Sequence, residues 1–172
     1  AEVSPSRMTR TSSFRTDNEK MRTVIEHGLM RLSRIDAEKA DAAWRRFSRS
    51  HQFDELSRLR ITTAIAVGLA EDNRFPEPDE RERLTQASGI EALALAAVRA
   101  MNWPEAAYWI DRLPDDLKVK SQWQYWLARS LHATDGDGER ADAILSALAA
   151  QRHYYGFLAA RQLGRCLLYT SP

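Results

Sequence analysis

Apolar residues recur every three or four positions along most of this 172-residue chain, in short segments separated by proline or glycine. That spacing places them on one face of an α-helix. The sequence contains only 7 glycines and 6 prolines, and it has no runs in which β-branched residues alternate with polar ones. We therefore expect an all-α protein. The segment from residue 17 to 35 shows the pattern clearly, with an apolar face of Met21, Val24, Ile25, Gly28, Leu29 and Leu32.

About eight short helices are expected from these segments. The fourth segment is expected to break near Ser88–Gly89. In the third segment, the spacing places Leu56, Leu59, Ile61 and Ile65 on the inward face. The segments are residues 17–35, 36–50, 53–70, 81–101, 102–114, 121–133, 139–151 and 154–164.

Several residues mark helix ends. Asp36 and Ser121 are predicted N-caps, because a side-chain oxygen at that position can accept a bond from a free backbone N–H. Pro104 falls where a first-turn proline is tolerated, and Pro114 marks the end of the same segment.

Consecutive segments pair loosely, at a spacing typical of helical-repeat arrays. Stacked hairpins need small residues where neighbouring helices approach. The predicted fold is an α-solenoid, a superhelix of stacked helical hairpins over residues 17–164, preceded by a poorly ordered segment at residues 1–16. No strict consensus of a named repeat is met. The small residues that recur beside aromatic or leucine partners are Ala42, Ala97, Ala106, Ala128, Ala143 and Ala159.

Composition excludes some classes of function. The net charge is +1, so the chain lacks the basic field of a nucleic-acid-binding protein. The longest apolar stretch, residues 61–70, is about half of what a membrane-spanning helix needs. Cys166 is the single cysteine, which excludes an internal disulfide.

The residues that could carry chemistry form no recognisable site. The four histidines, His27, His51, His132 and His153, lack metal-ligand spacing, and we expect them at the surface or half-buried. The segment TDGDGERADA departs from a calcium loop at two obligatory positions, Arg140 and Ser146, and reads as a turn. We therefore expect no catalytic, cofactor-binding or metal-ligating residue in this chain.

Aromatic residues are dense in the second half of the chain. We expect most of them to pack between hairpins, with Trp126 on the same stripe as Trp123 and Leu131. The alternative is a surface on which sugar rings stack. The group consists of Trp103, Tyr108, Trp109, Trp123, Tyr125, Trp126, Tyr154, Tyr155 and Phe157.

Three ordered motifs in residues 102–164 carry a family resemblance. They read W-x-x-A-x-x-W-I-x-x-L-P, then W-x-Y-W-x-A-R-x-L, then Y-Y-G-F-L-A-A-x-x-L-G. With these three motifs in this order, the chain resembles the soluble lytic murein transglycosylases of Gram-negative bacteria. The resemblance extends upstream to about residue 17, where it is weaker. The resemblance implies a ring-like superhelical domain that precedes a lysozyme-like catalytic domain, in the periplasm.

The resemblance also implies an activity and a partner. Enzymes of this family cleave the β-1,4 bond between N-acetylmuramic acid and N-acetylglucosamine in peptidoglycan glycan strands. One glutamate acts as acid and then base, and the muramic C6 hydroxyl attacks to give a 1,6-anhydro product, unlike the two-carboxylate scheme of hydrolases. That glutamate lies in a Glu-Ser motif, which this sequence lacks. We therefore expect a non-catalytic fragment whose catalytic domain is missing.

The ending CLLYTSP resembles the translation of a sequencing-library adapter, so residues 165–172 are expected to be non-native.

A second hypothesis for the chain as a whole is a tetratricopeptide-like scaffold that binds a peptide in its groove. Both hypotheses predict stacked hairpins; they differ in the ligand.

Overall fold

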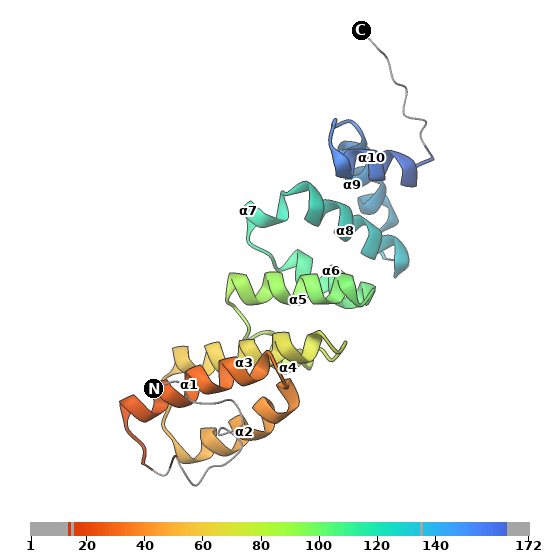
Figure 1. Ribbon diagram of the computed structural model, residues 1–172. Helices are drawn as coiled ribbons and strands as arrows, with labels where there is room; N and C mark the ends of the chain where they lie inside the picture. Colours follow the sequence, from red (N-terminus) through yellow and green to blue (C-terminus); the bar gives the residue numbers. More distant parts are fainter. Residues whose placement is uncertain (1–13, 15, 135, 165–172) are drawn as a thin grey trace. The chain divides into compact units, whose positions relative to one another are not determined.

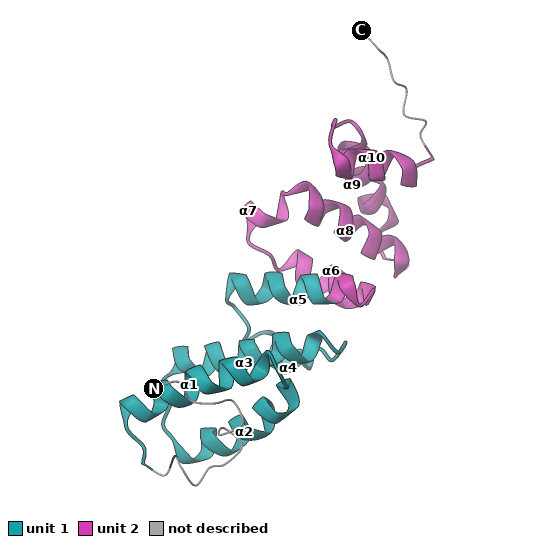
Figure 2. Ribbon diagram, viewed as in Figure 1, with its two compact units in different colours: residues 1–96 teal, residues 97–172 magenta. Residues whose placement is uncertain are grey.

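The computed structural model describes Phe14, residues 16–134 and residues 136–164, and these residues form ten helices and no strand (Figure 1). They divide into two compact units, residues 1–96 and 97–172, with the boundary inside α5 (Figure 2). The expectations for residues 165–172 and for most of residues 1–16 lie outside the described residues. The helices are α1 (Glu19–Ser33), α2 (Ala37–Ser50), α3 (Glu55–Ala70), α4 (Pro78–Arg81), α5 (Ala87–Arg99), α6 (Trp103–Asp111), α7 (Asp115–Lys118), α8 (Ser121–Ala133), α9 (Gly138–Ala149) and α10 (Tyr154–Gln162).

The expected number of about eight helices was too low, because α4 and α7 are single turns with no apolar face to detect. The fourth segment is divided as expected, but slightly earlier than Ser88–Gly89, at residues 82–86. Both residues lie in the first turn of α5, and the chain turns just before it. Gly89 serves a close approach instead, since a Cβ there would collide with the Cγ2 of Thr63 on α3.

The first unit has its core where α1, α2 and α3 pack on one another. Phe47 is central to it, with Phe14 edge-on at 5.6 Å between ring centroids. Leu56, expected inward, is 52% exposed. It precedes Ile61 by five residues, which turns it about 140° away from the core face of α3. The core residues are Phe14, Ile25, Leu29, Leu32, Ala40, Ala43, Trp44, Phe47, Phe53, Ile61 and Ile65.

Side-chain caps begin several helices, and one of the two predicted caps is among them. The Asp36 carboxylate accepts from the N–H of Lys39 at 2.9 Å, which confirms the predicted cap of α2. Pro104 lies in the first turn of α6, also as expected. The cap predicted at Ser121 was wrong: Lys120 occupies that position without a side-chain bond, and Ser121 is the first helical residue.

The second unit is built from helices packed in chain order, α6 on α8, α8 on α9 and α9 on α10. Its core contains Tyr125, Ala128, Ala141, Leu145, Leu148 and Ala159. Ala106, Ala128 and Ala159 are fully buried, as the small-residue pattern predicts. Ala42 and Ala143 are exposed, because in both helices it is the adjacent face that packs inward.

These observations confirm the expected fold class, an all-α array of helical hairpins. Among the described residues, no helix combines the length and apolar character needed to cross a membrane.

Candidate functional site

The described residues contain no cluster of histidine, cysteine and carboxylate side chains that could hold a metal ion. The TDGDGERADA segment acts in the structure as a helix start. The Asp137 carboxylate accepts from the N–H of Arg140 at 2.9 Å and caps α9, while Asp135 lies outside the described residues. The Arg140 guanidinium donates to both carboxylate oxygens of Asp111, at 2.7 and 3.2 Å, and this pairing raises the pKa of Arg140.

Two histidines are structural rather than free. His153 caps α10, as its Nδ1 accepts from the N–H of Gly156 at 3.1 Å. His51 is only 4% exposed, so its expected place at or near the surface was wrong. It lies against Phe47 and Phe53 because the chain turns there between α2 and α3.

The YYGFLAA motif forms α10, and its glycine is required by packing. A Cβ at Gly156 would lie 2.7 Å from the carbonyl oxygen of Leu148 and closer still to that of Gln151. The end of α9 therefore reaches α10 at a point where only glycine fits. Tyr155 packs beside Tyr125, with ring centroids 5.8 Å apart, and this contact links α10 to α8.

The aromatic group separates by burial. Trp109, Trp123 and Tyr125 are core residues, and the Nε1–H of Trp109 donates to Glu105 at 3.0 Å. Tyr154 and Phe157 are exposed, at 67% and 44%. Trp126 is half-buried and packs against the core of the second unit. The half-buried members of the group are Trp103, Tyr108, Trp126 and Tyr155.

Trp103 and Trp126 form the centre of the candidate site. Their rings are stacked, with centroids 6.5 Å apart and planes 17° apart. The guanidinium of exposed Arg129 lies 5.3 Å from the Trp103 ring and 5.8 Å from the Trp126 ring. We call these three residues the tryptophan–arginine surface.

The chemical groups of this surface are better suited to binding a carbohydrate than to catalysing a reaction. Aromatic faces carry negative potential, against which the C–H groups of a sugar ring can pack. A neighbouring guanidinium can bind a carboxylate on the same sugar. No base or nucleophile lies with these residues among the contacts that the structure describes. The sequence indicated the aromatic group, but it did not single out Arg129.

Fold and site together define an all-helical protein of successive hairpins with an aromatic surface. Over 56 residues, or 33% of its length, the chain is 43% identical to the soluble lytic murein transglycosylase of Salmonella typhimurium. These 56 residues correspond to 8% of that protein. No family model matches the chain.

Solved structures extend the likeness over most of the chain. The lytic transglycosylase Slt of Pseudomonas aeruginosa, solved as an inactive glutamate-to-glutamine mutant, superposes with a TM-score of 0.78 at 29% identity. That match covers 94% of this chain and 27% of the other. The 70 kDa soluble lytic transglycosylase of Escherichia coli shares the fold, with a TM-score of 0.68 at 23% identity over the same shares.

The chain is thus similar in sequence and in fold to soluble lytic murein transglycosylases, the family that its three motifs resemble. It spans about a quarter of the length of the solved enzymes that it matches.

Proposed function

We propose that this chain is part of the non-catalytic helical region of a periplasmic lytic murein transglycosylase. The parent enzyme would cleave the bond between N-acetylmuramic acid and N-acetylglucosamine in peptidoglycan and leave a 1,6-anhydro product. One observation carries the proposal: the match to the P. aeruginosa enzyme takes in 94% of this chain but 27% of that enzyme.

The carboxylates of the chain support a non-catalytic role. A general acid needs a carboxyl group in an apolar setting that keeps it protonated. Among the described residues, Glu26 is the carboxylate that is buried, at 8% exposed, but it accepts from the Ser57 hydroxyl at 2.8 Å and from Arg60 at 3.4 Å. Both partners lie on α3, so the Glu26 carboxylate is engaged in holding α1 against α3.

The tryptophan–arginine surface supports a role in holding glycan. N-acetylmuramic acid carries a lactyl group, whose carboxylate can remain free. A sugar ring on Trp103 or Trp126 would bring such a carboxylate within the field of Arg129. In this proposal the helical region engages the murein strand while another part of the parent enzyme performs the cleavage.

The downstream gene sequence tests the proposal. We expect an intact gene to encode, after the residue corresponding to Gly164, a lysozyme-like domain with a Glu-Ser motif. An unrelated continuation in intact genes, such as further helical repeats and then a stop codon, would contradict it. That outcome would favour the peptide-binding scaffold.

A further inference from the structure

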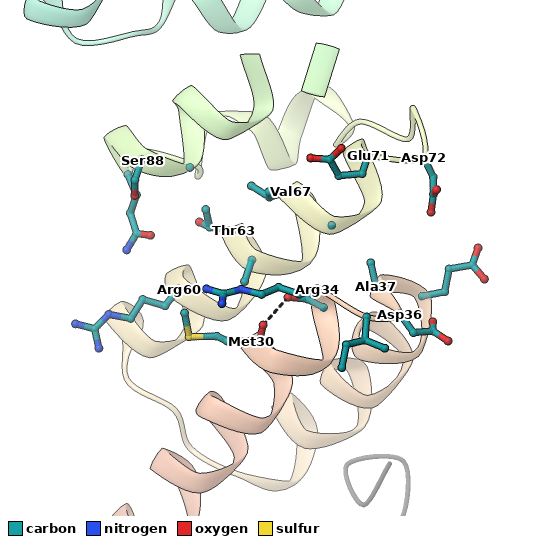
Figure 3. A pocket seen from close by; sticks show the side chains of 17 residues that line it. Met30, Arg34, Asp36, Ala37, Arg60, Thr63, Val67, Glu71, Asp72 and Ser88 are labelled. Carbon is teal, nitrogen blue, oxygen red and sulfur yellow. Dashed lines mark hydrogen bonds between the residues drawn. The ribbon is translucent and has the colours of Figure 1, made fainter. Parts of the chain in front are cut away.

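A groove of about 710 Å³ lies in the first unit, in a part of the molecule that the tryptophan–arginine surface does not use. Its walls are the end of α1 with the turn into α2, the middle of α3, and the start of α5 (Figure 3). This volume is within the range of pockets that bind small ligands. All of its lining residues belong to the first unit.

Several of the residues that line the groove are small. Gly68 on α3 lies so close to the α1–α2 turn that a Cβ there would collide with the carbonyl oxygen of Ser33. Ala37 and Ala64 continue the lining. Gly68 therefore allows α3 to pack directly against the end of α1, where Gly68 and Ser33 both line the groove.

The charges of the groove are separated. Figure 3 shows Arg34 and Arg60 extending toward one side, while Glu71 and Asp72 lie at the other. A groove with positive charge at one end and negative charge at the other favours a ligand that carries both charges.

Most of the charged groups around the groove are already neutralised within the chain. Arg60 pairs with Glu26 at 3.4 Å, and Glu38 pairs with Arg74. Arg34 and Asp72 differ: within the described part of the chain, neither side chain has a hydrogen-bond or ion-pair partner. They are therefore the groups available to a ligand.

A buried hydroxyl provides an independent observation. Thr63 lines the groove and is 6% exposed, and its Oγ1 has no hydrogen-bond partner among the described residues. Buried hydroxyl groups are nearly always bonded, so a group left without a partner needs an explanation. A ligand in the groove can supply the missing partner, after a small rotation of the side chain.

We propose that this groove binds a short peptide that carries both a free carboxylate and a free ammonium group. Arg34 receives the carboxylate, Asp72 receives the ammonium group, and the Thr63 hydroxyl bonds a peptide group between them. The inference does not depend on the proposed role in murein cleavage. It gives the helical hairpins a peptide site in addition to a glycan surface.

Calorimetric titration of the full chain with two tetrapeptides tests this proposal. One is the murein stem peptide L-Ala-γ-D-Glu-diaminopimelate-D-Ala, and the other is linear Ala-Glu-Lys-Ala with free termini. We expect saturable binding of at least one peptide and no binding of the N-acetylated, C-amidated form of Ala-Glu-Lys-Ala in which Glu and Lys are replaced by Gln. Preference for the stem peptide would identify murein as the source of the ligand, whereas equal affinity would indicate peptides in general.

Matched variants locate the site. Arg34→Gln and Asp72→Asn are each expected to weaken binding about tenfold, the effect of losing one charge-assisted hydrogen bond. Arg46→Gln and Asp79→Asn change the same charges on exposed helix faces outside the groove and are expected to leave the affinity unchanged. Both groove residues are exposed, so circular dichroism should show intact folding. Failure of both tetrapeptides to bind, or equal affinity in all four variants, would overturn the proposal.

Discussion

The imidazole of His153 connects the start of α8, the turn after α9 and the first turn of α10. Its Nδ1 accepts from the N–H of Gly156 in α10, while its Nε2 lies 2.8 Å from Oε1 of Gln151, just after α9. The same Nε2 lies 3.2 Å from the hydroxyl of Ser121, at the start of α8. The HYYG sequence is therefore a structural junction: the histidine caps the helix and the glycine admits the end of α9.

Gly156→Ala should destabilise the chain by about 1–3 kcal/mol, the usual range for an overpacked site. We expect the upper end because the added methyl group meets two backbone carbonyl oxygens, which cannot move aside. Gly138→Ala is the matched control, since a Cβ there meets nothing within 4 Å. Urea unfolding followed by circular dichroism measures both. Equal midpoints for the two variants would show that α9 and α10 do not approach so closely.

Trp109→Ala and Trp126→Ala should separate packing from binding. Trp109 is fully buried, and its truncation should cost about 3–5 kcal/mol. Trp126 is half-buried, so its truncation should destabilise the chain less. Trp126→Ala should, however, lower the affinity for soluble murein glycan. Urea midpoints and glycan titrations provide the two measurements. If Trp126→Ala bound glycan like the unmodified chain, the tryptophan–arginine surface would not be the glycan site.

Thr63→Val should raise the melting temperature of the chain. The substitution keeps the shape of the side chain and removes a buried hydroxyl that has no partner. Thr62→Val on the same helix is the control: its hydroxyl donates to the carbonyl oxygen of Arg58 at 2.9 Å, so its loss should not stabilise the chain. Differential scanning calorimetry would decide. A lower melting temperature for Thr63→Val would mean that the hydroxyl has a partner in solution.

Asp54 should make the stability of α3 depend on acidic pH. The backbone N–H of Ser57 donates to the Asp54 carboxylate and lowers the pKa of Asp54 below its ordinary value. A carboxylate with a lowered pKa stabilises the folded state above its unfolded pKa, and that stabilisation is lost as pH falls through the folded pKa. We expect Asp54→Ala to be less stable than the unmodified chain at pH 7, with the difference shrinking in acid. Urea unfolding at pH 7 and pH 3 measures the difference in free energy of unfolding between the two proteins. If that difference did not depend on pH, the charge of Asp54 would not contribute to capping α3.

The fold could be predicted because the apolar spacing of most segments is regular enough to place faces, as for Ile25, Leu29 and Leu32, which are all buried. The single-turn helices α4 and α7 could not be predicted, because a four-residue helix has no periodicity to detect. At the candidate site, the sequence indicated the density of tryptophan. The position of Arg129 over both rings depends on how α6 and α8 pack, which local spacing does not encode.

The glycine positions show the same limit. Gly89 resembles a helix break in sequence but is a point of close packing against Thr63. The groove was missed for a related reason. Its parts come from the turn after α1, from α3 and from the start of α5, which only the tertiary structure brings together.

The release of anhydro-muropeptides tests the central claim most directly. Purified murein sacculi would be incubated with the product of an intact gene for this protein and, separately, with this chain alone, and the soluble products analysed by mass spectrometry. We predict 1,6-anhydro-muropeptides from the intact product and none above a buffer control from this chain. Their absence with the intact product, or their release by this chain alone, would contradict the assignment of this chain to the non-catalytic helical region.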